Sequence, residues 1–141
     1  MSTILLVEDE PSILTLMSLI LEPSGHVLLK ASAVEEAFLR FDEADASIDL
    51  LIADVNLPET SGIQLAVELR GLLPNLPLIL TSGHTPDRWD EQDSARLNEL
   101  PSESVAVLQK PFLPDTFLQT ISRFVTVPMR PGAALAKAAT C

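Results

Sequence analysis

The sequence predicts an α/β fold: one domain with a parallel five-stranded sheet and helices on both of its faces. Five short runs rich in Ile, Leu and Val alternate with longer segments of helical period, which gives a (βα)5 pattern. These runs are nearly continuous rather than alternating in polarity, as expected of strands that are buried on both faces. The expected strands are 3–7, 27–31, 50–55, 78–82 and 105–109.

Four of the segments between and after the strands carry recognisable helix start signals. Pro11 suits the first turn of a helix after the first strand. Ser32 and Glu35 have the spacing of a capping box before the second helix. Ser61 is placed to cap the third helix, and Asp115 falls in the first turn of the fifth.

The fourth helix has the weakest signal. Between residues 85 and 104 the sequence has few apolar and many charged residues, which predicts a short or irregular helix with long flanking loops. Trp89 is an isolated aromatic residue in this polar stretch. It either covers the core beneath the fourth helix or marks a contact surface, and we favour the core.

The chain length of 141 residues fits one domain of ordinary size, which we place at 1–126. After Thr126 the composition shifts to Pro, Gly and Ala, and we expect 127–141 to be a flexible tail. We find no internal repeat and expect no effector domain.

Composition and charge exclude several classes of partner. Asp and Glu number 20 against 9 Lys and Arg, and the net charge of −11 argues against direct binding to nucleic acid. The apolar runs are too short to span a bilayer, and the acidic residues at 8–10 interrupt any signal-peptide core. We therefore expect a cytoplasmic protein without membrane contact. The single cysteine, Cys141, cannot form an internal disulfide.

Polar residues gather where the expected strands end. In an open parallel sheet, ligands bind beyond the carboxyl ends of the strands, so these residues are expected to share one edge. The first, third, fourth and fifth strands end in Glu8-Asp9, Asp54-Val55-Asn56, Ser82-Gly83 and Lys110-Pro111 respectively.

Three carboxylates at one edge need a positive partner. Two unit charges about 4 Å apart repel by roughly 4 kcal/mol at an effective dielectric of 20. Glu8, Asp9 and Asp54 therefore indicate a bound Mg²⁺, a hard cation that prefers oxygen ligands and shares phosphate oxygens. Lys110 adds a second, fixed positive charge, and Ser82 offers a hydroxyl donor for a phosphoryl oxygen. Together these residues predict phosphoryl transfer to a carboxylate, with Asp54 as the nucleophile.

The same residues, in this order and each at a strand end, resemble the receiver domain of two-component response regulators over roughly Ser2 to Val125. The resemblance implies a flavodoxin-like fold with strand order 2-1-3-4-5. It also implies a signalling module that takes its phosphoryl group from a histidine kinase or a histidine phosphotransfer protein. Such a module is not an enzyme for a separate substrate, although it can catalyse its own phosphorylation and dephosphorylation. Neither the downstream partner nor the oligomeric state follows from these residues.

The resemblance assigns a role to each matching position at the metal. It implies that Glu8 and Asp9 hold Mg²⁺, Asp9 directly, while Asp54 accepts the phosphoryl group and also binds the metal. Asn56 would offer its backbone carbonyl to the ion. Asn56 also begins a loop that, together with Gly62, resembles the family's loop after the phosphoacceptor.

The resemblance also implies a switch. Ser82 would be the hydroxyl that moves toward the phosphate, Lys110 would pair with the phosphate, and the peptide bond after Lys110 is expected to be cis. Thr81 competes for the switch role, and we choose Ser82 because it directly precedes the small Gly83. Val107 departs from the family, because many members carry an inward-flipping Tyr or Phe there.

Two other functions fit parts of the same pattern. A magnesium-dependent phosphohydrolase with an aspartyl-phosphate intermediate would need a general acid two residues after its nucleophile, where this chain has Asn56, and a cap over its substrate. A scaffold that no longer turns over phosphate is disfavoured by the intact acidic set. His84 is expected to be a solvated loop residue that influences water access to the acyl phosphate.

Overall fold

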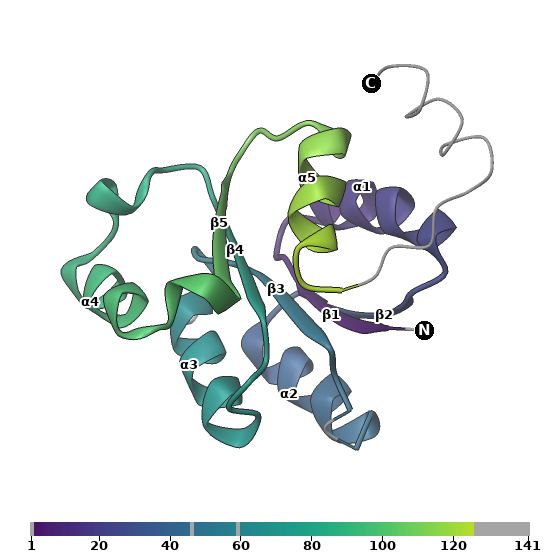
Figure 1. Cartoon of the computed structure of the whole chain (residues 1–141), viewed down its shortest axis with the longest axis horizontal. Helices are drawn as coiled ribbons and strands as arrows, with labels where there is room; N and C mark the ends of the chain where they lie inside the picture. The colour runs from purple at the N-terminus through teal and green to yellow at the C-terminus, as the bar shows by residue number, and fades with distance from the viewer. Residues whose placement is uncertain (1, 46, 59, 126–141) are drawn as a thin grey trace.

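A computed structural model describes residues 2–45, 47–58 and 60–125 of the chain. Five parallel strands form one sheet in the order β2-β1-β3-β4-β5 (Figure 1). The fold class and strand order predicted above are confirmed. The strands are β1 (Thr3–Val7), β2 (Val27–Ala31), β3 (Leu50–Asp54), β4 (Leu78–Ser82) and β5 (Val105–Gln109).

Helices cover both faces of the sheet, with α1 and α5 on one face and α2, α3 and α4 on the other (Figure 1). Short 3₁₀ turns follow α1 and flank α4. The helices are α1 (Pro11–Leu21), α2 (Val34–Glu43), α3 (Gly62–Leu72), α4 (Glu91–Glu99) and α5 (Pro114–Ser122), and the turns are η1 (Glu22–Ser24), η2 (Pro86–Arg88) and η3 (Ser102–Ser104).

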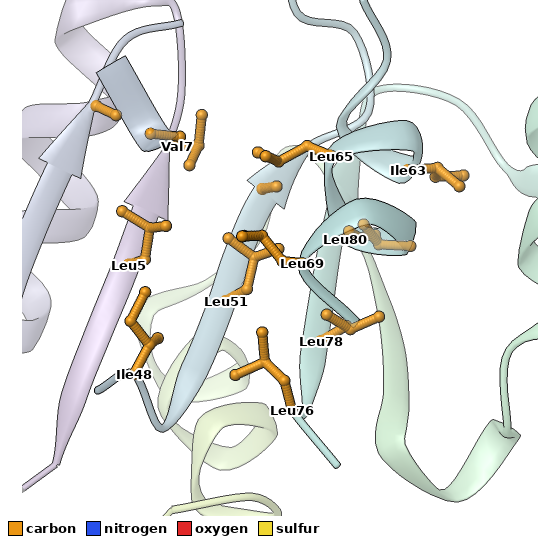
Figure 2. Packing of buried hydrophobic residues seen from close by; sticks show 14 of the residues in the cluster. Leu5, Val7, Ile48, Leu51, Ile63, Leu65, Leu69, Leu76, Leu78 and Leu80 are labelled. Carbon is orange, nitrogen blue, oxygen red and sulfur yellow. The ribbon is translucent and has the colours of Figure 1, made fainter. Parts of the chain in front are cut away.

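The strands separate two apolar cores, one on each face of the sheet. Successive residues of a strand point to opposite faces, so Leu5 and Leu51 join the core under α2 and α3, while Ile4 and Leu50 join the core under α1 and α5. Figure 2 shows part of the first of these cores, in which side chains of α3 pack onto β3 and β4, and Leu5 and Val7 of β1 belong to the same cluster. Burial on both faces explains why the strands read as continuous apolar runs.

Three of the four predicted helix starts are found in the structure. Pro11 is the first residue of α1, and Asp115 lies in the first turn of α5. Ser61 caps α3, and its Oγ accepts a hydrogen bond from the backbone N–H of Gln64 at 3.1 Å. This bond satisfies one of the N–H groups that a helix start leaves without a partner.

The predicted capping box of Ser32 and Glu35 is wrong by one residue. The helix α2 begins at Val34, with Ala33 as its N-cap, so Glu36 occupies the third helical position. Its carboxylate accepts from the backbone N–H of Ser32 at 2.6 Å. The reach-back contact therefore exists, but it comes from the next glutamate.

The fourth helix is short, as predicted. None of the residues of α4 is buried, and Asp90 caps it by accepting from the backbone N–H of Gln92 at 2.7 Å. Trp89 packs against the core under α2 and α3, which agrees with the core position favoured above. Among the residues that the structure describes, no helix combines the length and apolarity needed to cross a bilayer. The predicted tail, 127–141, lies outside the described residues.

Candidate functional site

The carboxyl ends of β1 and β3 bring three carboxylates together. Glu8 directly follows β1 and is only 1% exposed, whereas Asp9 next to it is exposed to solvent. Asp54 is the last residue of β3 and is 5% exposed. One carboxylate oxygen from each of the three residues lies within 4.8 Å of the others. The parallel pairing of β1 with β3 places these residues at the same edge.

Lys110 ties two of the three acids together. It follows β5, and its Nζ donates to Glu8 Oε1 at 2.6 Å and to Asp54 Oδ2 at 3.1 Å. The backbone N–H of Asn56 donates to the other oxygen of Asp54 at 3.2 Å, and the backbone N–H of Glu10 donates to Glu8 at 3.1 Å. Both buried carboxylates are therefore oriented by hydrogen bonds, as buried charges must be.

Burial and charge shift the pKa values of this group. Burial raises the pKa of Glu8, the charge of Asp54 adds to that rise, and the hydrogen bonds from Lys110 and the Glu10 backbone only partly oppose it. Burial alone would lower the pKa of Lys110, but its hydrogen bonds to Glu8 and Asp54 outweigh burial and raise it. The lysine is thus charged at neutral pH, and the cluster holds three acidic side chains against one basic side chain.

The donor set fits a divalent cation. Three carboxylates against one ammonium group make the donor set acidic, and a divalent cation such as Mg²⁺ would offset that charge. Within residues 2–45, 47–58 and 60–125, the Asp9 carboxylate takes part in none of the hydrogen bonds or ion pairs of the structure, so it is free to serve as a ligand. Oxygen donors are also what Mg²⁺ prefers.

The first turn of α3 packs against the backbone of Asp54. A Cβ atom on Gly62 would lie 2.0 Å from the Asp54 carbonyl oxygen, so only glycine fits at this position. The backbone N–H of Gly62 donates to the Val55 carbonyl at 2.9 Å, and an isolated bridge joins Asn56 to Ser61. The loop after β3 is closed by these contacts, which hold the Asp54 backbone in place.

Ser82, at the end of β4, is completely buried, and among the described residues its hydroxyl makes no hydrogen bond to the acids. Its Oγ accepts from the backbone N–H of His84 at 3.1 Å and from the indole Nε1–H of Trp89 at 3.2 Å. Thr81 is also buried, and its hydroxyl has no hydrogen-bond partner among the described residues. The contact of Trp89 with Ser82 is the feature that sequence reasoning missed.

Pro111 and Asn56 are also at this edge, whereas Val107 lies in the middle of β5. The Lys110–Pro111 peptide bond is cis, as expected. Asn56 is exposed beside Asp54, and the role of its carbonyl stays a prediction. Val107 is 37% exposed on β5.

Comparison with known proteins agrees with this geometry. The family model for the response regulator receiver domain matches residues 4–122. The chain belongs to this family. The match spans all five strands and all five helices of the fold, and it includes all the acids of the cluster and Lys110.

Relatives of this receiver domain include regulators and a kinase. It is 31% identical over 112 residues to the sensor kinase CckA of Brucella abortus, covering 79% of this chain and 11% of that protein. It is 33% identical over 111 residues to the regulatory protein PhoP of Bacillus subtilis, covering 79% of this chain and 43% of that protein. The chain thus spans less than half the length of either relative.

Solved structures of single receiver domains match over nearly their whole length. The chemotaxis protein CheY4 of Vibrio cholerae is 25% identical with a TM-score of 0.75, covering 89% of this chain and 99% of that one. The receiver domain of the hybrid histidine kinase CckA is 30% identical with a TM-score of 0.69, covering 86% of this chain and 97% of that one.

Proposed function

We propose that this receiver domain accepts a phosphoryl group on Asp54 from a histidine kinase or a histidine phosphotransfer protein. The observation that carries the proposal is the position of the Asp54 carboxylate. One of its oxygens is held by Lys110 at 3.1 Å, and the carboxylate lies within ligand distance of two further acids. A fixed cation beside a nucleophilic carboxylate is what phosphoryl transfer requires.

The transfer is a balanced substitution at phosphorus. An oxygen of Asp54 forms the new O–P bond while the P–N bond of the donor phosphohistidine breaks, and the electron pair of that bond returns to the imidazole nitrogen. Lys110 offsets negative charge on the phosphoryl oxygens, and the backbone N–H of Asn56 orients the carboxylate. Ser82 supplies a hydroxyl that donates to a phosphoryl oxygen once the group is in place.

A magnesium ion would be held by Glu8, Asp9, Asp54 and the backbone carbonyl of Asn56. When bound, it supplies positive charge to the phosphoryl oxygens and relieves the repulsion among the three acids. The excess of acidic over basic side chains at the site supports this assignment.

Apolar surface beside the site suits a protein as phosphodonor. A hollow between α1 and the segment after β5 is lined by Ile13, Leu16, Lys110, Pro111 and Phe112. Leu16 is 47% exposed there, and Leu113 nearby is 71% exposed. Large exposed side chains around a charged centre are typical of a protein contact surface. We propose that the donor protein docks on this side.

The output of the domain is a change in partner binding. Phosphorylation adds a charge of about −1.5 to −2 at a site that is already acidic. We propose that the loop after Ser82 and the surface formed by α4, β5 and α5 respond to this charge. The cytoplasmic location predicted from the sequence stays a prediction.

The proposal is tested by incubating the protein with acetyl phosphate and Mg²⁺ and measuring intact mass. We expect the native chain to gain one phosphoryl group and Asp54→Asn to gain none. Asp115→Asn, which removes an exposed carboxylate far from the acid cluster in the sequence, is the matched control and should label normally. Equal labelling of the native chain and Asp54→Asn, or labelling of neither, would refute the proposal. Catalytic release of phosphate from many monoesters would instead indicate the phosphohydrolase.

A further inference from the structure

The hydroxyl of Ser82 has both of its acceptor positions occupied. A serine hydroxyl can accept two hydrogen bonds and donate one. The backbone N–H of His84 and the indole N–H of Trp89 fill the two acceptor positions, at 3.1 and 3.2 Å. Ser82 can therefore only donate to any further group. Within the described residues, its hydroxyl makes no hydrogen bond to Asp54 or Lys110.

From this geometry, and resting on the function proposed above, we infer that Trp89 is a positioning residue that holds the Ser82 hydroxyl away from Asp54 until a phosphoryl group arrives. The switch role proposed for Ser82 requires its Oγ to move toward the phosphoryl group. A change between staggered rotamers moves it by on the order of 2 Å, which breaks a hydrogen bond that is already 3.2 Å long.

Release of the serine costs little, because the indole N–H is shared. It also donates to the backbone carbonyl of His84, at 3.0 Å. When Ser82 leaves, the indole keeps this acceptor, so the tryptophan donor is not left without a partner. The backbone N–H of His84 loses its acceptor, but it belongs to an exposed residue that water can reach. The contact is thus strong enough to bias the serine and weak enough to be broken by a charged phosphoryl group.

The same contact connects the site to α4. Trp89 immediately precedes Asp90, which caps the helix, and none of the side chains of α4 is buried. The half-buried Trp89, Leu97 and Leu100 are the apolar side chains of this region that pack against the core. Loosening Trp89, one of these three anchoring side chains, would shift α4, because this helix buries little other apolar surface.

The first test uses fluorescence, because Trp89 is the only tryptophan and the chain has no tyrosine. Beryllofluoride, a reversible phosphoryl mimic, is titrated with Mg²⁺ into the full chain. We expect the emission of Trp89 to change on saturation in the native protein and in Ser82→Thr, and to stay constant in Ser82→Ala. An equal change in Ser82→Ala, or no change in a native protein that calorimetry shows to be saturated, would overturn the inference.

The second test measures beryllofluoride affinity by calorimetry in Trp89→Phe, which keeps a ring and removes the N–H donor. We expect roughly two- to fivefold tighter binding, the factor that corresponds to one weak net hydrogen bond. In a Ser82→Ala background the same substitution should have no effect, because Trp89 acts through the serine. Unchanged or weaker binding in Trp89→Phe, or the same gain without Ser82, would contradict the inference. Failure of the native chain to bind beryllofluoride at all would instead count against the proposed function.

Discussion

Gly62→Ala is predicted to be the most disruptive single-methyl change near the site. The added Cβ would lie 2.0 Å from the carbonyl oxygen and 2.8 Å from the carbonyl carbon of Asp54, both backbone atoms. Side-chain Cβ atoms essentially never approach closer than 3.0 Å, so the first turn of α3 and the end of β3 must separate by about 1 Å. Overpacking of this kind typically costs about 1–3 kcal/mol and occasionally more. Because neither contact is with a flexible side chain, we expect Gly62→Ala to lower the free energy of unfolding by about 3 kcal/mol.

The matched control is Gly71→Ala in the same helix. A Cβ on Gly71 would meet nothing within 4 Å, so this substitution gains helix propensity without a clash and should stabilise by roughly 0.5–1 kcal/mol. Urea unfolding of the two variants and the native chain measures the free energy of unfolding. Equal stability of Gly62→Ala and Gly71→Ala would refute the reasoning. We also expect Gly62→Ala to be phosphorylated more slowly, since Asp54 moves.

Three further predictions follow from the site and its surroundings. Ser61→Ala removes the cap on the backbone N–H of Gln64 and should cost about 1 kcal/mol in urea unfolding, with an unchanged m-value. Burial raises the pKa of Glu8, so the folded state favours the protonated form of this side chain. The stability that this preference contributes is present below the ordinary pKa of 4.5 and is lost as pH rises through the raised value. With a chelator present, Glu8→Gln should therefore unfold at higher urea than the native chain at pH 7, and the gap should close toward pH 4. Adding Mg²⁺ should raise the melting temperature of the native protein at pH 7 and much less at pH 4, where protons compete with the metal for Glu8. An equal rise at both pH values would count against carboxylate ligands.

The sequence was sufficient to predict the elements of this fold. Each strand is a five-residue, mostly apolar run, and four of the five strand ranges agree with the structure residue for residue. Only β3 is shorter, because it ends at Asp54 and Val55 already belongs to the following loop. The capping box at α2 was placed one residue early, because two adjacent glutamates satisfy the motif and only the backbone angles of Ala33 decide between them.

The candidate site was predictable where it depends on strand ends and was not where it depends on loop packing. Glu8, Asp54 and Lys110 converge because parallel strands end at one edge. The contact between Trp89 and Ser82 depends on the path of the chain through η2, and no local pattern in the sequence specifies that path. The close approach of Gly62 to Asp54 likewise depends on how α3 packs on β3.

The sheet gives Asp54 and Ser82 different neighbours. By the alternation along each strand, Asp54 shares its face with Ile52 and the core under α1 and α5, whereas Ser82 shares its face with Leu80 and the opposite core. A phosphoryl group on Asp54 that accepts a hydrogen bond from Ser82 would connect the two faces of the sheet at the carboxyl ends of β3 and β4. Phosphorylation on the face where the donor protein is proposed to dock would thereby affect α4 on the opposite face without any rearrangement of the strands.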